Sequence, residues 1–191
     1  MATHKLIISG FGGQGVMMMG QMIAYAGMME EKHVTWLPAY GPEMRGGTAN
    51  CSVIVSDRPI SSPIISKATA VVAMNYPSLL KFEPMVIPGG LLFANTSLIS
   101  ERCFRNDLLI VSVNANDIAL EFKNDKVSNM VMLGAILAGT SVVSRESLYK
   151  VMEKVFAGAK AKLIPLNKQA LEAGFEIGKA TCAENLNISD F

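Results

Sequence analysis

Short apolar runs alternate with helical patterns along most of the chain. Runs with the length of buried strands stand at residues 5–9, 33–36, 49–55, 70–74, 91–94 and 108–113. Helices are predicted at residues 14–29, 117–122, 127–138 and 166–180, with a short one after Asn75 and an amphipathic one after Ser144. Asn75, Asn116 and Ser144 each stand where a helix N-cap is expected. Residues 181–191 show no pattern and are expected to form a loose tail.

The chain opens with a strand, a glycine loop, a helix and a second strand, which is the order of a βαβ unit. In such a unit the crossover is right-handed, so we expect strands 5–9 and 33–36 to be neighbours. The loops that follow them would then share the carboxyl edge of the sheet, where α/β folds bind ligands. The whole pattern predicts an α/β fold: a three-layer sandwich with a mostly parallel, Rossmann-like sheet and a helical C-terminal third, in a single domain over residues 1–191.

Composition excludes several function classes. Half of the 191 residues are hydrophobic and the net charge is +1, so the chain is neither a disordered segment nor a basic nucleic-acid binder. No residue from Leu6 to Met29 is charged, but glycines interrupt this stretch and Gln14 and Gln21 are polar, so we expect no membrane segment. The first half carries only a third of the charged side chains, which indicates that its elements are covered by its own helices or by another chain.

The cysteines do not predict a metal centre. Cys51, Cys103 and Cys182 lie far apart without a C-x-x-C pattern, and only His4 and His33 accompany them. Neither a zinc site nor a cysteine-ligated iron–sulfur cluster is therefore expected on this chain. An odd number of thiols without a secretory signal favours the reducing cytoplasm.

The first candidate site is the G-x-G-x-x-G segment between the first strand and the first helix, Gly10-Phe11-Gly12-Gly13-Gln14-Gly15. Glycines permit positive φ angles and let an anion approach the free N–H groups of a helix N-terminus. A dinucleotide site also needs an acidic residue at the end of the second strand, and here the nearest acids, Glu30 and Glu31, precede that strand. The segment is interpreted as a tight turn or the site of another anion, with a bound dinucleotide as the less favoured alternative.

The second candidate site is the loop after the second strand, Tyr40-Gly41-Pro42-Glu43-Met44-Arg45-Gly46-Gly47. Glu43 and Arg45 are its charged residues, held among glycine and proline, and Gly46 follows them directly. The Arg45 guanidinium suits a carboxylate or phosphate. An ion pair that pins the loop, or a contact with a neighbouring subunit, is an equal alternative.

Six methionines give the first helix an apolar surface on every side: Met17, Met18, Met19, Met22, Met28 and Met29. Such a helix must be covered on every side, either by the core or by another subunit, and we weigh these two interpretations equally. Small residues at positions 20, 24 and 27 form one stripe that permits close backbone approach. We find no nucleophile elbow and no catalytic set, so a complete active site on this chain is not expected.

Four segments together resemble the gamma subunit of the 2-oxoacid:ferredoxin oxidoreductases. They are GFGGQGV at 10–16 followed by Gly20, YGPEMRGG at 40–47, SDRPI at 56–60 followed by Ser62-Pro63, and Asn129 followed by LGA at 133–135. Their order and spacing fit that family over residues 5–138, although each piece alone is weak.

The resemblance implies an accessory subunit of a multi-subunit enzyme. In that family the alpha and beta subunits hold thiamine diphosphate and magnesium, and the iron–sulfur clusters lie on beta and delta-type chains. The family reaction is the oxidative decarboxylation of a 2-oxoacid with coenzyme A as co-substrate, which yields an acyl-CoA and CO₂ and reduces ferredoxin. The pair Gly46-Gly47 resembles the 2-oxoglutarate and branched-chain members more than the pyruvate members, so 2-oxoglutarate is the favoured substrate.

Within this resemblance we expect the segment Gly10–Gly15 and the Glu43/Arg45 loop to face the alpha and beta subunits and to shape the approach of the cofactor or of coenzyme A. Two alternatives remain: a free-standing oxidoreductase that binds a dinucleotide, and a purely structural docking subunit. The stoichiometry of the complex, and whether the isolated chain forms a homodimer, stay open.

Overall fold

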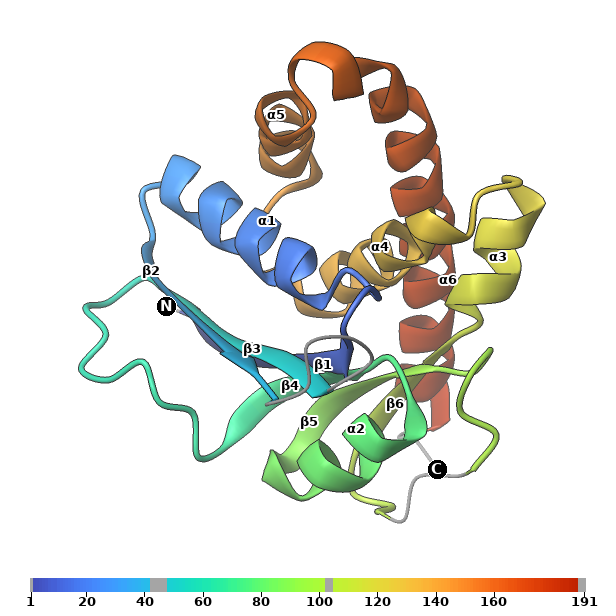
Figure 1. Ribbon diagram of the computed structural model, residues 1–191. Helices are drawn as coiled ribbons and strands as arrows, with labels where there is room; N and C mark the ends of the chain where they lie inside the picture. The colour runs from blue at the N-terminus through green and yellow to red at the C-terminus, as the bar shows by residue number, and fades with distance from the viewer. Residues whose placement is uncertain (1, 42–47, 102–104, 189–191) are drawn as a thin grey trace.

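The computed structural model describes residues 2–41, 48–101 and 105–188, which form a six-stranded sheet and its covering helices (Figure 1). The strands are β1 (Thr3–Phe11), β2 (His33–Tyr40), β3 (Thr48–Ser56), β4 (Ala68–Ala73), β5 (Val86–Asn95) and β6 (Leu109–Val113). The helices are α1 (Val16–Met29), α2 (Tyr76–Phe82), α3 (Ala115–Glu121), α4 (Ser128–Thr140), α5 (Arg145–Val155) and α6 (Ile164–Ile188). Turns of 3₁₀ helix occupy Glu83–Met85, Asp125–Val127 and Gly158–Leu163.

The sheet is mostly parallel, as the sequence predicts, but β1 and β2 are not neighbours. The strand order is β2-β3-β1-β4-β5-β6; β1, β4, β5 and β6 are parallel, and β3 runs antiparallel to both β1 and β2. β3 is apolar on both faces at Val53, Ile54 and Val55, which suits an interior strand. Pro38 cannot donate to a ladder and suits the edge position that β2 takes. The predicted adjacency of β1 and β2 was therefore wrong, because β3 inserts between them.

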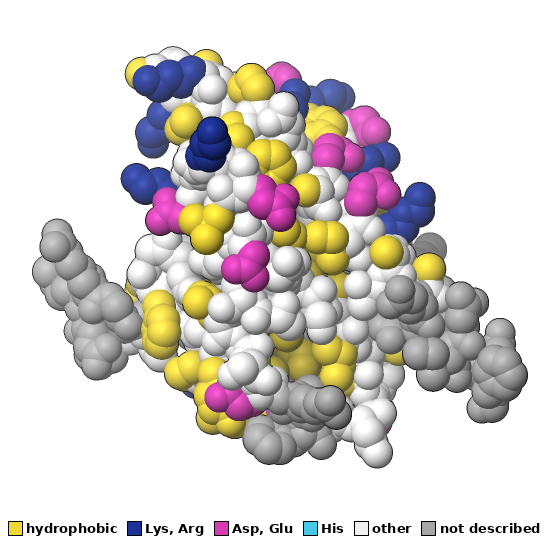
Figure 2. Space-filling model, turned by 90° about the vertical axis from the view of Figure 1, so that its right-hand side faces the viewer, with side chains coloured by type: hydrophobic (Ala, Val, Ile, Leu, Met, Phe, Trp, Pro, Cys, Tyr) yellow, Lys and Arg dark blue, Asp and Glu magenta, His cyan; other side chains and the backbone are white. Residues whose placement is uncertain are grey.

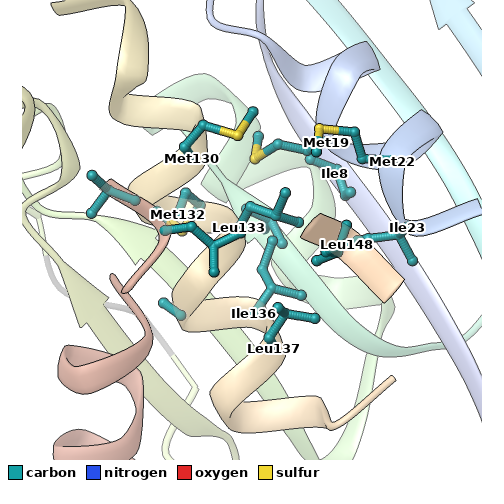
Figure 3. Packing of buried hydrophobic residues seen from close by; sticks show 14 of the residues in the cluster. Ile8, Met19, Met22, Ile23, Met130, Met132, Leu133, Ile136, Leu137 and Leu148 are labelled. Carbon is teal, nitrogen blue, oxygen red and sulfur yellow. The ribbon is translucent and has the colours of Figure 1, made fainter. Parts of the chain in front are cut away.

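Helices cover the two faces of the sheet unequally. On one face α1, α4, α5 and α6 build the larger core, where Figure 3 shows side chains of α1 and α4 meeting Ile8 of β1 and Leu148 of α5. On the other face α2 and the segment between β3 and β4 cover a smaller core that includes Ile7, Ile54 and Leu92. The fold is thus the expected α/β arrangement, with most of its helices in the C-terminal half.

Glycines let the helices of the larger layer approach very closely. A Cβ on Gly20 would lie 3.0 Å from Trp36 Nε1, and one on Gly27 would lie 2.9 Å from Val34 Cγ2, so the small-residue stripe of α1 packs directly on β2 and β3. Helices α4 and α6 cross with their backbones in contact, since a Cβ on Gly134 would lie 2.7 Å from the backbone nitrogen of Phe175.

The ends of several elements differ from the prediction. Asn75 and Ser144 cap α2 and α5 as expected, by accepting hydrogen bonds from the backbone N–H groups of Ser78 and Ser147. Asn116 is not a cap, because α3 begins at Ala115. Helix α6 continues to Ile188, so the residues after 180 begin in a helix rather than in a patternless tail.

Figure 2 shows how charge is distributed over the face formed by α6 and its neighbours. Most basic and acidic side chains gather in the upper part of that face, where α5 and the start of α6 lie, and the lower part carries few. Among the described residues, none of the helices is both long enough and apolar enough to cross a membrane.

Candidate functional site

The segment between β1 and α1, residues 12–15, is a turn whose backbone requires glycine at two positions. Gly13 has φ +100° and Gly15, the residue before α1, has φ +73°, both in a region that side chains rarely adopt. No side chain caps the start of α1. The first N–H groups of this helix are therefore available to a ligand or to another chain.

Packing, and not an approaching anion, accounts for two of the glycines. A Cβ on Gly10 would lie 2.6 Å from Gln14 Oε1 and 2.9 Å from Met74 Cβ. A Cβ on Gly15 would lie 2.7 Å from Asn129 Cγ. Gly13 is different, because a Cβ there would meet nothing within 4 Å. The open part of the turn is therefore at Gly12 and Gly13, which are exposed.

Gln14 ties this turn to the end of β4. Its Oε1 accepts hydrogen bonds from the backbone N–H of Phe11 at 2.6 Å and from Asn75 Nδ2 at 3.0 Å, and its Nε2 donates to the carbonyl of Met74 at 3.4 Å. The side chain is thus engaged on both ends within the protein. Its role is to hold the turn against the neighbouring strand rather than to present an amide to a ligand.

Buried amides extend this bracing across the carboxyl ends of the parallel strands. Asn95, fully buried at the end of β5, donates from Nδ2 to the Met74 carbonyl at 3.2 Å and to Asn116 Oδ1 at 2.8 Å. Its Oδ1 accepts from the Ala115 N–H at 3.2 Å. The N–H groups of Asn116 and Asp117 donate to Ser97 Oγ, so the start of α3 is capped from a distant loop. These hydrogen bonds tie together the carboxyl ends of β4, β5 and β6.

Beside the turn lies a cleft of about 540 Å³, between residues 13–18 and the segment 124–129. Two buried amides line it, those of Asn129 and Asn167, together with the apolar side chains of Phe156 and Leu163. Asn129 Nδ2 is in contact with Met18 Sδ at 3.7 Å, and Asn167 Nδ2 donates to the Leu163 carbonyl at 2.7 Å. Amides and the free end of α1 suit a polar or anionic group. The lining also includes one carboxylate, Asp125, and one ammonium, Lys126.

The second predicted loop adjoins the first at its base. Glu43, Arg45 and Gly46 lie outside the described residues, but the residues that flank them are placed. The Gly41 N–H donates to the Thr48 carbonyl at 2.7 Å, and Thr48 pairs with Phe11 at the end of β1. The expected proximity of the two loops thus holds at their bases, although β3 brings them together and not a direct pairing of β1 with β2.

The insertion of β3 also removes the geometry of a dinucleotide site. The second strand of such a site lies next to the first, so that its terminal carboxylate reaches the ribose. Here β2 stands two strand spacings from β1, roughly 10 Å away, and the described residues at its end, Tyr40 and Gly41, carry no carboxylate. Both observations argue against a free-standing dinucleotide-binding enzyme.

The methionines of α1 divide between the core and the surface. Met19 and Met22 are fully buried in the larger core, whereas Met28 is 61% exposed and Met29 is 38% exposed. The core interpretation is therefore confirmed for Met19 and Met22, and the subunit interface stays a prediction for the exposed end of the helix.

Thiols and metal-binding groups give the described residues no further chemistry. They contain no cluster of three or more His, Cys, Asp or Glu side chains that could hold a metal ion. Burial raises the pKa of the Cys51 thiol to about 12, with opposing hydrogen bonds from Trp36 and Gly20 too weak to offset it. A thiol in this state is inert at neutral pH.

Sequence reasoning missed Asn95 and Asn167. Asn95 could have been found, because it directly follows an apolar run at the carboxyl end of a predicted strand, where parallel sheets place their polar groups. Asn167 gives no local signal, since only the packing of α6 against the segment 124–129 brings it to the cleft.

Comparison with known proteins gives consistent matches over most of the chain. Residues 5–177 match the family model described as pyruvate ferredoxin/flavodoxin oxidoreductase. The ketoisovalerate oxidoreductase subunit VorA of Methanothermobacter thermautotrophicus is 40% identical over 175 residues, which are 90% of this chain and 36% of the relative. The 2-oxoglutarate synthase subunit KorC of Methanocaldococcus jannaschii is 32% identical over 179 residues, which are 92% of this chain and 94% of the relative.

A solved structure agrees with these relatives. The gamma subunit of a keto/oxoacid ferredoxin oxidoreductase from Geobacter sulfurreducens superimposes with a TM-score of 0.79 at 28% sequence identity, covering 93% of this chain and 99% of that chain. The chain thus spans about a third of the VorA relative but nearly the full length of KorC and of the Geobacter subunit.

Proposed function

Since the chain belongs to the pyruvate ferredoxin/flavodoxin oxidoreductase family, we propose that it is the gamma subunit of a 2-oxoacid:ferredoxin oxidoreductase. The observation that carries the proposal is the match over nearly the whole length of the KorC and Geobacter subunits, both of which are parts of larger enzymes by name. The complex would oxidatively decarboxylate a 2-oxoacid with coenzyme A, release an acyl-CoA and CO₂, and reduce ferredoxin.

The chemistry would be supplied by partner subunits. Thiamine diphosphate, magnesium and the iron–sulfur clusters belong, in this proposal, to alpha, beta and delta-type chains. The complex would work in the cytoplasm, where free thiols such as Cys51 and Cys182 persist.

The two candidate loops would face the partner subunits and shape the approach of coenzyme A. The open turn at Gly12 and Gly13, the uncapped start of α1 and the amide-lined cleft beside them suit the anionic groups of that co-substrate. Arg45, which lies outside the described residues, would add a cation. Arg45→Ala should weaken assembly of the complex or its turnover without unfolding the chain. Unchanged yield of the complex and unchanged activity would contradict this part of the proposal.

Among substrates, 2-oxoglutarate is the first candidate, because the Gly46-Gly47 pair resembles the 2-oxoglutarate and branched-chain members and the KorC relative carries 2-oxoglutarate in its name. A branched-chain 2-oxoacid is the second candidate, since the VorA relative, named for ketoisovalerate, has the higher identity. The pocket that selects between them would lie largely on other subunits.

The proposal is tested by tagging this chain in its own host and purifying it without oxygen. We expect thiamine-dependent and iron–sulfur subunits to purify with it in fixed ratio. That sample would then be given 2-oxoglutarate, 2-oxoisovalerate or pyruvate, and the rate of viologen reduction with each 2-oxoacid would rank the substrates. Recovery of the chain alone, carrying a flavin or nicotinamide, would restore the dinucleotide alternative and remove the proposal.

A further inference from the structure

The outer face of α1, directed away from the sheet, is unusual for a solvent-facing helix surface. None of the fourteen residues of α1 is charged, and Tyr25, Met28 and Met29 are 46%, 61% and 38% exposed. An exposed helix face normally carries charged side chains, and contiguous apolar surface on a folded protein marks an interaction site. This face therefore suits a contact with another chain better than it suits water.

A groove runs along this face, between α1 and α5. It has a volume of about 680 Å³ and is lined by Tyr25, Met28 and Met29 from α1 and by Val151, Lys154 and Val155 from α5. The two helices are in contact, and the start of α5 lies at the end of α1, where the Ser144 N–H donates to Glu30 Oε1 at 2.7 Å. Two packed helices with an apolar furrow between them form the surface into which an amphipathic helix docks.

The lining is apolar apart from the Gln21 amide, the Tyr25 hydroxyl to which that amide donates, and one charge, the ammonium of Lys154. Within the described part of the chain, Lys154 has no ion-pair partner, and the lining residues include no carboxylate that could serve as one. A chain that covers the groove would bury this ammonium beside apolar surface, which is costly unless the incoming chain brings a negative charge. Charge complementarity therefore calls for an acidic residue on the occupant.

From this geometry we infer that the α1/α5 groove is the docking site for an amphipathic helix of another subunit, with an apolar face toward Met28 and Val151 and a carboxylate placed against Lys154. The inference rests on the proposed function, because it takes the chain to be one subunit of a complex. Beyond the proposed function, it names the surface of this chain that is contacted, and the secondary structure and charge of the segment that contacts it.

A second copy of this chain fits the groove less well. Pairing the groove with itself around a two-fold axis would bring the Lys154 of both copies into one apolar interface. None of the described lining residues carries a negative charge to separate them. The occupant is therefore a chain with a different sequence.

The test measures binding of the purified full chain to the rest of its complex, at about 50 mM and about 500 mM salt. Met28→Asp places a charge in the groove, and Leu120→Asp, at a residue of α3 that is 62% exposed, is the matched control. Lys154→Glu reverses the groove charge, and Lys67→Glu, on an exposed segment beyond β3, is its control. Thermal unfolding of each variant shows that it folds.

We expect Met28→Asp to weaken binding at least tenfold at both salt concentrations. Lys154→Glu should weaken it by about three- to tenfold at low salt and by much less at high salt, because opposite charges at the interface are screened. Both controls should stay within twofold of the parent chain. A photo-crosslinking residue in place of Tyr25 should form an adduct with an acidic helix of another subunit.

The inference is overturned if Met28→Asp binds like the parent, if the Lys154→Glu effect does not depend on salt, or if the crosslink at position 25 joins two copies of this chain. A crosslink to a segment that is not helical or carries no carboxylate also overturns it. These outcomes differ from a failure of the proposed function, in which the unaltered chain itself binds no other subunit of such an enzyme.

Discussion

Gly15 and Asn129 are in such close contact that no side chain fits at position 15: a Cβ there would lie 2.7 Å from Asn129 Cγ and 2.8 Å from Asn129 Cβ. Gly15 ends the turn after β1, and Asn129 belongs to the first turn of α4, more than a hundred residues later. The contact fixes the start of α1 against the wall of the cleft. The shape of the candidate site is therefore set by a long-range contact as well as by the glycines themselves.

Gly15→Ala should lower the free energy of unfolding by about 2–4 kcal/mol. The backbone contributes about 1–2 kcal/mol because φ is +73°, and the clash with Asn129 contributes the rest. Gly158→Ala is the matched control, since its φ is +66° but a Cβ there meets nothing within 4 Å, so only the backbone cost applies. Urea unfolding measures the loss in the free energy of unfolding for both variants. Equal losses would contradict the close contact between Gly15 and Asn129.

Gly134→Ala should destabilise the protein, although helix propensity alone predicts the opposite sign. Alanine in a helix interior is favoured over glycine by roughly 0.5–1 kcal/mol. At position 134, however, a Cβ would press against the Leu171 carbonyl and lie 2.7 Å from the Phe175 nitrogen, so α4 and α6 must separate. We expect a net loss of about 2–4 kcal/mol in urea unfolding. A variant as stable as the parent would show that the two helices do not cross in this way.

Glu30 should make stability depend on pH below pH 4.5. Burial raises the pKa of its carboxyl, but hydrogen bonds from Lys32, from the Ser144 N–H and from Ser147 outweigh burial and lower the pKa from 4.5 to about 2. Because the folded pKa lies below the unfolded one, the stabilisation is complete above pH 4.5 and is lost as pH falls toward 2.

Glu30→Gln should therefore cost about 1–2 kcal/mol at pH 7 and almost nothing at pH 2. Thermal unfolding of the variant and the parent across this range measures the difference. Glu31→Gln, at the exposed neighbouring residue, is the control and should be as stable as the parent at pH 7. A constant gap between the Glu30 variant and the parent from pH 7 to pH 2 would contradict the ion pair with Lys32.

Removal of the Gln14 side chain should loosen the turn at the candidate site. Gln14→Ala leaves the Asn75 amide without its acceptor and frees the turn from β4, at a cost of about 1–2 kcal/mol. Amide exchange of the N–H groups at residues 11–15 should become faster. Gln21→Ala, on the surface of α1, should change stability by less than about 0.5 kcal/mol and leave that exchange as it was.

The strands and most helices could be predicted because each has a local signal. The run at residues 70–74, the caps Asn75 and Ser144 and the small-residue stripe of α1 all appear where the pattern indicated. The place of β3 could not be predicted, since an apolar strand can pair on either side of its neighbours and no local signal selects the side.

The same limit applies to the candidate site. The turn between β1 and α1 follows from sequence, because glycines between a strand and a helix permit positive φ, which Gly13 and Gly15 adopt. The cleft does not, because Asn129 and Asn167 reach it only through the packing of α4 and α6. The prediction of Asn116 as an N-cap was wrong for a related reason. The side chain of Ser97, nineteen residues earlier, accepts the hydrogen bond from the Asn116 N–H at the start of α3.

The central claim is that this chain completes a 2-oxoacid:ferredoxin oxidoreductase, and reconstitution tests it most directly. Partner subunits purified without oxygen would be assayed for 2-oxoacid- and coenzyme A-dependent viologen reduction, before and after addition of this chain. We predict that activity appears or rises at least tenfold on addition and saturates at a fixed ratio of subunits. Full activity without the chain, or none after a stable complex has formed, would contradict the account.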